Sequence, residues 1–355
     1  MLITTLGLLA FVSASLGILA RSETKFYSVL FNQIILGFIG GLLALWLCTR
    51  IPYSFWRRYS FYIFLAALAL TLSVFIPNFG FAHGGARRWI SIGPVSFQPA
   101  EFLKIAFVIY FASWLAWARK KQEDFKFRII PLLILLGIVA AALLRQPDTK
   151  SLILIIIAAC GMLFTSGVSW KKIIGILVLG VGAVIVLAFV RPYVMDRIKT
   201  FINPSSDPRG SSYQLQQSLI AIGSGGGFGR GLGQSVQKFN YLPEPQGDSI
   251  FAVIGEEFGF LGTTILLVLY VFFAIRGYKI ALRAPDTFSR YLVVGLITLL
   301  TAQSFLNIAS LVGLFPLTGV PLVFISHGGT ALLISMATVG IILNVSRYES
   351  RTKSL

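Results

Sequence analysis

The sequence predicts an all-α polytopic membrane protein with about ten transmembrane helices and a long extracytoplasmic loop between helices 7 and 8. Three observations lead to this prediction: the apolarity of the whole chain, the grouping of its apolar residues into long runs, and the uneven placement of its basic residues. The 355 residues are expected to form a single domain.

The composition lies outside the range of soluble domains. Mean hydropathy is +0.83, and 56% of the residues are hydrophobic while only 12% are charged, against about 25% charged in soluble domains. The apolar residues form runs close to the roughly 17–20 residues that a helix needs to cross a bilayer. These runs are 2–20, 31–49, 61–76, 102–118, 129–144, 152–166, 173–190, 250–275, 291–315 and 329–345.

Two of these runs are short, and the first one lies at the N-terminus, where a signal peptide would also be apolar. The runs at 129–144 and 152–166 are short, which predicts tilted or partly re-entrant segments. The run at 2–20 has no charged region before it and no small-residue cleavage site after it, so we expect a retained helix and not a signal peptide.

Basic residues indicate the orientation of the spans. Most Lys and Arg residues lie in connections that alternate to one side, at 50–58, 119–128, 171–172, 276–290 and in the tail. Since such residues mark the cytoplasmic side, both termini are predicted to be cytoplasmic. The net charge of +17 is then a topological signal that suits anionic lipid headgroups, and a nucleic-acid partner is not expected.

The few cysteines and histidines of the chain argue against a disulfide framework and against a zinc site. Cys48 and Cys160 fall in or beside predicted spans and form no C-x-x-C motif, so no disulfide framework is expected. His83 and His327 cannot form a zinc site by themselves.

Three segments on the extracytoplasmic side, 77–100, 191–249 and 316–328, interrupt the apolar pattern. The loop 191–249 is too long for a simple connection. It opens with a charged, turn-rich stretch, and then Tyr213, Leu215, Leu219 and Ile222 follow at the spacing of an amphipathic helix. Segment 316–328 is apolar but broken by Pro and Gly, which is tolerated at membrane depth only inside protein or beside a wet cavity.

Within the loop 191–249, the glycine-rich stretch "GSGGGFGRGLGQS" directly after Ile222 has two interpretations. Backbone N–H groups of such a loop can bind phosphate oxygens. However, no strand precedes it and no Gly-Lys-Ser/Thr follows it, so a nucleotide-binding loop is disfavoured. The alternative is a turn that lets two backbones approach closely.

Several ionisable residues lie where lipid-exposed charge is costly. Glu101 and Lys104 share a helix face at the start of the fourth predicted span, which favours an ion pair, a charged cavity wall, or both. Arg87 and Arg88 stand at the extracytoplasmic boundary, where an arginine fork suits pyrophosphate and also anchors to headgroups. Further cations on that side, Arg209, Arg230 and Lys238, would make the region attractive to anions.

Asp248 is the residue that most strongly indicates chemistry. It follows Pro243, Pro245 and Gly247 and directly precedes a long apolar run. It could cap that helix, or it could act as a general base at a lipid–water boundary. Glu256 and Glu257, about two turns into the same run, could line the same cavity or bond across the helix bundle.

With these residues in place, the chain resembles the SEDS family of membrane glycosyltransferases (FtsW and RodA). The resemblance rests on "GARRWISIGPVSFQPAEFLKIA" at 85–106, "QPD" at 146–148, the stretch 207–262 containing "LPEPQGDSIFAVIGEE", and "NIASLVGLFPLTGVPLVFISHGGTALL" at 307–333. "SVQKFNYLPE" and "AVIGEE" are closer to the division type, FtsW. The resemblance implies one SEDS-type domain over 1–355, with the loop 191–249 carrying the catalytic motif.

The resemblance also implies a function. Members polymerise glycan strands from lipid II at the outer face of the bacterial cytoplasmic membrane, in cell division or cell shape, beside a class B penicillin-binding protein. The family carboxylate regarded as catalytic falls on Asp248. Substrate contacts are then expected from Arg87, Arg88, Gln98, Glu101, Lys104, Arg209, Lys238, Glu244, Ser326 and His327, and a divalent cation (Mg²⁺ or Mn²⁺) is the expected cofactor.

The chain departs from the family pattern at several positions. Gln246 and Gly247 replace His-Thr before the acid, Ser249 replaces Phe after it, "PDTKS" replaces "PDxGT" at 147–151, and His327 replaces a common Tyr. Two other functions stay open from the residues alone. Intramembrane charges also suit a lipid II flippase or other transporter, and a scaffold that activates a transpeptidase would not need Asp248.

Overall fold

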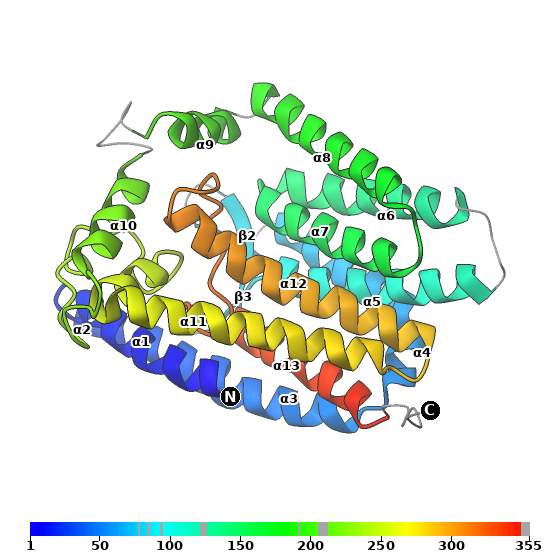
Figure 1. Cartoon of the computed structure of the whole chain (residues 1–355), viewed down its shortest axis with the longest axis horizontal. Coiled ribbons are helices and arrows are strands. Elements are labelled where there is room, and N and C mark those ends of the chain that lie inside the picture. Colours follow the sequence, from blue (N-terminus) through cyan, green and yellow to red (C-terminus); the bar gives the residue numbers. More distant parts are fainter. Residues whose placement is uncertain are drawn as a thin grey trace. The chain divides into compact units, whose positions relative to one another are not determined.

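The computed structural model of the chain describes residues 1–76, 79–83, 86–92, 95–120, 126–190, 192–204 and 212–348. Figure 1 shows the order of elements. They are α1 (Leu2–Leu19), α2 (Glu23–Phe31), the π-helix η1 (Asn32–Ile39), α3 (Gly40–Arg50), α4 (Tyr53–Leu72), the 3₁₀-helix η2 (Ser73–Phe75), β1 (Gly80–His83), β2 (Ala86–Ile92), β3 (Val95–Phe97), α5 (Pro99–Lys120), α6 (Lys126–Arg145), α7 (Thr149–Thr165), α8 (Trp170–Val190), α9 (Pro192–Ile202), α10 (Tyr213–Ser224), α11 (Ile250–Leu282), α12 (Thr287–Leu311) and α13 (Gly329–Ser346).

The helices confirm an all-α polytopic membrane protein. Each apolar run predicted as a span overlaps a helix. In the described part of the chain, seven helical stretches are long and apolar enough to cross a membrane: Leu2–Leu19, Glu23–Arg50, Tyr53–Phe75, Pro99–Lys120, Ile250–Leu282, Thr287–Leu311 and Gly329–Ser346. The two runs predicted as short are the shorter apolar helices Ile129–Arg145 and Thr149–Thr165.

Contacts within the chain define two compact units that interleave along the sequence. Unit 1 comprises Met1–Ile35, Val178–Phe273 and Gln303–Leu332, and unit 2 comprises Leu36–Leu177, Ala274–Ala302 and Leu333–Leu355. Because each unit draws on segments from distant parts of the sequence, neither is a sequential domain. The single domain over 1–355 stays a prediction.

The core of unit 1 joins α1 to the start of α11. Phe11 and Ala14 of α1 belong to one buried cluster with Ile250 and Val253 of α11, and with Leu322 from the connection between α12 and α13. Small residues of α1 allow close backbone approach elsewhere in the unit, since a Cβ on Gly7 would meet the Phe324 carbonyl and one on Gly17 the Lys238 carbonyl. This core supports the loop that carries Asp248.

The core of unit 2 is built around α5. Leu103, Phe107 and Phe111 of α5 are buried, and Phe64 of α4 stacks on Tyr110 with ring centroids 5.4 Å apart. The α4–α5 pair is therefore closely packed.

A small antiparallel sheet, order β1-β2-β3, occupies part of segment 77–100. Its register pairs Gly80 with Ile90 and Phe97 with Ile90, and a bulge lies between Phe81 and Ala82. The all-α prediction missed this sheet, because the strands are short and their alternation is interrupted by glycines. The sheet places Arg87 and Arg88 on β2.

Two helices lie in the described residues of the long loop. The amphipathic helix predicted from Tyr213 is confirmed as α10, but Leu219 is exposed, and the buried positions are Leu215, Ser218 and Ala221. The stretch predicted as charged and turn-rich contains α9, which begins at Pro192, a residue favoured at the first helical position.

Helix α11 is broken inside the apolar run. Gly259 has φ 64° and ψ −162°, which no helix tolerates. The backbone groups released by the break are bound by the glycine-rich loop: the N–H groups of Arg230 and Gly231 donate to the carbonyls of Glu256 (3.0 Å) and Glu257 (2.9 Å), and the N–H groups after the break donate to Gly226 and Gly227. Backbone polar groups in lipid need hydrogen-bond partners within the protein, and this loop supplies them at the break in α11.

The glycines of this loop therefore serve close backbone approach. Gly229 has φ 82°, and a side chain there would collide with the Glu257 carbonyl. We expect Gly229→Ala to reduce the yield of folded protein severely. Gly227→Ala, in the same loop but with open space around its Cα, should behave like the wild type. Thermal unfolding and size-exclusion profiles in detergent compare the two; equal behaviour would contradict this account of the loop.

Candidate active site

Asp248 lies at the end of a loop whose backbone is fixed from several sides. Asn307 Nδ2 donates to the Asp248 carbonyl at 2.8 Å, Ser326 Oγ donates to the Gly247 carbonyl at 2.8 Å, and the His327 N–H donates to the Gln246 carbonyl at 2.7 Å. These bonds tie the loop to α12 and to the connection before α13. Asp248 is thus presented by a rigid backbone, as precise chemistry requires.

Helix α11 begins at Ile250, so Ser249 is the residue directly before it. The N-cap position is the flanking residue itself. Ser249 is also bound from outside the loop, since Gln214 Nε2 of α10 donates to its hydroxyl at 3.0 Å. Ser249 therefore separates Asp248 from the first residue of α11.

The Asp248 side chain lines a polar cavity of about 240 Å³ within unit 1. Its lining comes from four separate parts of the chain: α9, α10, the loop before α11 and the connection after α12. The lining residues are Asp196, Arg197, Thr200, Gln214, Asp248, Leu317 and Gly319. The cavity thus combines carboxylate, guanidinium, hydroxyl and amide groups around one candidate base.

Most of these residues were not predicted from the sequence. Asp196, Arg197 and Thr200 stand on α9, in a stretch interpreted only as charged and turn-rich. The signal that could have found them is the 3–4-residue spacing of polar positions in "MDRIKTF", which puts them on neighbouring turns of a helix.

The predicted residues of unit 1 mainly build the frame of the site. Ser326 is buried, and its hydroxyl also accepts from the Leu322 N–H at 2.7 Å. His327 stacks on Phe11 with centroids 5.9 Å apart, and burial lowers the pKa of its imidazole to about 4. It therefore carries no positive charge at neutral pH. Glu244 has φ 45° and its carbonyl accepts from Gly247 N–H at 2.9 Å, which closes the turn before Asp248.

Lys238 belongs to a buried ionic network behind the loop. Its Nζ lies 2.8 Å from Glu257 Oε1, and both side chains are essentially inaccessible, at 0% and 1% exposed. Ser13 of α1 donates to the same carboxylate at 2.7 Å. The neighbouring Glu256 accepts from the N–H groups of Val236 and Gln237. The ammonium of Lys238 is thus committed to Glu257 and does not line the cavity beside Asp248.

Glu256 and Glu257 consequently bond across the fold, as one of their two sequence interpretations held. Each carboxylate is satisfied by side chains or N–H groups of the loop 233–238. A buried charge is tolerated only with such partners. The pair fixes the loop to the first part of α11.

The other predicted residues that the structure describes belong to unit 2. Glu101 and Lys104 form the expected ion pair at 2.9 Å, and both are buried. Arg88 Nε donates to the Gln146 carbonyl at 2.9 Å, and its Nη2 donates to that of Pro147. Gln98 is buried, and Arg87 is exposed. Arg209 lies outside the described residues.

The "QPD" block is part of the same arrangement in unit 2. Asp148 caps α7, because its Oδ1 accepts from the Ser151 N–H at 3.4 Å, and its Oδ2 also accepts from the Ser151 hydroxyl at 2.7 Å. Gln146 is buried and donates to the carbonyl of Thr71. Arg88 therefore holds a turn whose conformation is fixed on both sides.

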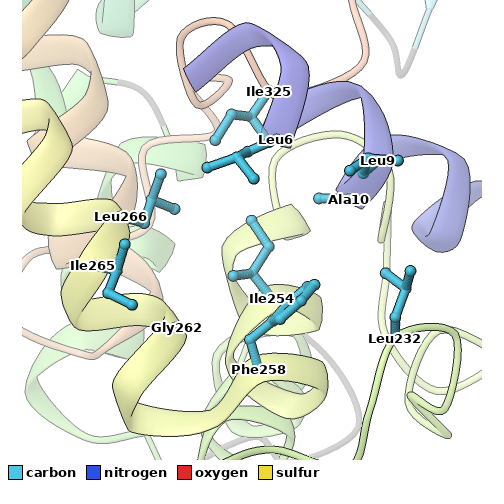
Figure 2. Close-up of a pocket in the computed structure, with 10 residues that line it drawn as sticks. All are labelled: Leu6, Leu9, Ala10, Leu232, Ile254, Phe258, Gly262, Ile265, Leu266 and Ile325. Carbon is cyan, nitrogen blue, oxygen red and sulfur yellow. The ribbon is translucent and has the colours of Figure 1, made fainter. Parts of the chain in front are cut away.

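A second cavity of unit 1 is entirely apolar. It measures about 280 Å³ and is lined from α1 and from both sides of the break in α11. Figure 2 shows Leu6, Leu9 and Ala10 of α1 across from Ile254 and Phe258 of α11. Leu6, Leu9 and Phe258 are among the exposed large hydrophobic residues, which suits contact with lipid.

The whole chain matches a known protein family. A family model for FtsW, RodA and SpoVE, described as cell cycle protein, matches residues 1–351. The chain belongs to the FtsW/RodA/SpoVE family. Stage V sporulation protein E of Bacillus subtilis is 38% identical to this family member over 354 residues, covering 98% of this chain and 95% of that protein.

Other FtsW/RodA/SpoVE relatives agree in sequence and in structure. The probable peptidoglycan glycosyltransferase FtsW of Coxiella burnetii is 38% identical and covers 97% of this chain and 93% of its own. A chain of a solved peptidoglycan synthase complex that coordinates polymerization and crosslinking has a TM-score of 0.80 at 26% identity, covering 99% and 97%. RodA of Thermus thermophilus has a TM-score of 0.69 at 25% identity, covering 99% and 96%.

These names confirm the predicted family and the predicted FtsW-like character of this FtsW/RodA/SpoVE chain. The assignment of substrate-binding residues stays a prediction.

Proposed function

We propose that this chain is a peptidoglycan glycosyltransferase that polymerises glycan strands from lipid II, with Asp248 as the general base. The family and its relatives named as peptidoglycan glycosyltransferases support the reaction class. The observation that carries the assignment of the base is the placement of Asp248 in a polar cavity on a loop fixed by α12 and by the 326–327 backbone.

The proposed step transfers a growing glycan onto a new sugar. The Asp248 carboxylate accepts the proton of the acceptor 4-hydroxyl. At the same time the oxygen of that hydroxyl bonds to the anomeric carbon of the donor. The bond from that carbon to undecaprenyl pyrophosphate breaks, and the pyrophosphate leaves with the electron pair. Direct displacement inverts the configuration at that carbon. One carboxylate suffices because pyrophosphate leaves without a paired acid, in contrast to glycosidases.

Arg88 and Lys104 are proposed to bind the departing pyrophosphate. Both are already bonded within unit 2, Arg88 to carbonyls and Lys104 to Glu101. A divalent cation, Mg²⁺ or Mn²⁺, is a further proposal. Among the described residues no group of three or more His, Cys, Asp or Glu side chains fits such an ion.

The proposed setting follows the topology and the relatives. The chain would lie in the bacterial cytoplasmic membrane with both termini cytoplasmic and Asp248 on the outer side. The apolar cavity of Figure 2 offers a surface suited to a lipid chain. A class B penicillin-binding protein would be its partner, in the division or elongation machinery, since a matching chain comes from a peptidoglycan synthase complex.

The deciding experiment measures polymerisation and transport in one preparation. Purified protein in liposomes would receive lipid II and a divalent cation, with and without the transpeptidase partner. Wild type is expected to yield glycan polymer on a gel, and a folded Asp248→Ala variant none. Movement of lipid II across the bilayer without polymer would favour a transporter. Polymer from the partner that needs this chain but not Asp248 would favour a scaffold.

A further inference from the structure

The cavity beside Asp248 contains a cation that the proposed step does not yet use. Arg197 of α9 lines this cavity. Its Nη1 donates to the carbonyls of Leu317 (2.9 Å) and Thr318 (2.8 Å). Both hydrogens of Nη1 are therefore committed to the backbone, and the direction of the planar guanidinium is set before any substrate arrives.

The Arg197 guanidinium and the Asp248 carboxylate both lie beside Gly319, at the position that a side chain would occupy. A Cβ atom built on Gly319 would lie 3.1 Å from Asp248 Oδ2 and 3.6 Å from Arg197 Nη2. Gly319 also has φ 64°, which disfavours any other residue. The bare Cα thus allows Arg197 and Asp248 to approach over the backbone of one residue.

Asp248 is anchored to that same short segment from the other side. Asn307 Nδ2 donates to the carbonyl of Asp248 at 2.8 Å and to that of Val320 at 2.7 Å. Arg197 is bonded at 317 and 318, and Asp248 is linked through Asn307 to 320. The four residues 317–320 therefore fix the acid and the cation relative to each other.

From this arrangement we propose that Arg197 is a positioning residue for Asp248: it holds the carboxylate ionised and aimed into the cavity. The inference rests on the proposed function, in which Asp248 must be deprotonated to act. A nearby cation favours the charged form of a carboxylate and so lowers its pKa, by about 1–3 for close pairs. A base that stays ionised at lower pH remains competent over a wider range.

Other charged groups around Asp248 do not supply this effect. Asp196, also on α9 and in the cavity, acts in the opposite direction because it is an anion. Glu244, in the same loop as Asp248, is another anion, and the imidazole of His327 stacks on Phe11 and is neutral at pH 7. Among the described residues that line the cavity, Arg197 is the basic one.

The test is the pH dependence of the initial rate of polymerisation. In Arg197→Gln, the loss of the cation raises the pKa of Asp248, so the acid limb of the profile should move to higher pH by about one unit, while activity recovers at alkaline pH. Arg197→Lys keeps the charge and should retain most of the wild-type limb. Lys199→Gln removes an equal charge from the same helix outside the cavity, and its profile should match the wild type.

Three results would overturn the inference. One is a profile of Arg197→Gln that superimposes on the wild type. A second is a folded Arg197→Gln and Arg197→Lys pair that is inactive at every pH, which would place Arg197 directly on the substrate. A third applies if the glutamine variant does not fold: raising salt from about 0.1 M to 1 M shortens the screening length from about 10 Å to about 3 Å, and a wild-type acid limb that does not move upward would then count against the pair.

Failure of the proposed function has a different signature. In that case wild type forms no polymer, or Asp248→Asn polymerises with the wild-type pH profile. Neither result depends on Arg197.

Discussion

Replacing Asp248 with asparagine is expected to lower the rate of glycan polymerisation by about 100- to 10,000-fold, the usual contribution of a general base. The amide has nearly the same shape as the carboxylate but cannot take up the acceptor proton. The loop should keep its conformation, because the carbonyls of 246–248 accept hydrogen bonds from His327, Ser326 and Asn307 that the substitution leaves in place. Initial rates with purified protein and lipid II measure the effect.

The matched comparison is Asp196→Asn, which removes a carboxylate from the same cavity. We expect a far smaller loss, since Asp196 has no part in the proton transfer. If the two variants exchanged their behaviour, Asp196 would be the base. Asp248→Glu, which keeps the acid but moves it by one methylene, should retain partial activity.

The second large effect is expected in stability. Lys238→Met would leave the Glu257 carboxylate buried without its cation, and removing one partner of a buried ion pair typically costs about 3–5 kcal/mol. The pair is fully buried, with 2.8 Å between Nζ and Oε1. Thermal unfolding of the purified protein in detergent should show a markedly lower midpoint, independent of any substrate.

Two controls separate charge from packing. The double variant Lys238→Met/Glu257→Gln removes both charges and should recover much of the loss. Arg230→Gln breaks a comparable pair, 3.4 Å from Glu256, whose arginine is 42% exposed. Such pairs contribute about 0–1 kcal/mol, so its midpoint should stay near that of the wild type. A drop as large as that of Lys238→Met would refute the assignment of the stability to the buried pair.

The parts of the fold that depend on local composition could be predicted. Apolar runs determine spans because lipid selects for length and apolarity over one continuous segment. The ion pair of Glu101 and Lys104 could also be predicted from local sequence, because positions i and i+3 share a helix face. Asp248 stood out because its local context, a Pro- and Gly-rich loop before a span, is unusual.

The cavity could not be predicted because its members come from four separate segments. The sequence contains nothing that relates Arg197 to Gly319, and their proximity follows only from packing. The buried face of α10 was partly wrong for the same reason: Leu219 is apolar but exposed, while Ser218 packs inward. In lipid or beside other protein, hydrophobicity alone does not say which face is covered.

The bonds around Asp248 also bear on how this protein can vary through evolution. Arg197, Asn307 and Ser326 all donate to main-chain carbonyls, and the side chains of the residues that accept take no part in those bonds. Positions 246 and 247 can therefore change identity while the acid keeps its place. Gln246 and Gly247, which depart from the expected family pattern, are therefore compatible with the position of Asp248. Sequence drift in this loop is a poor guide to lost activity, whereas substitution of a donor such as Asn307 is a strong one.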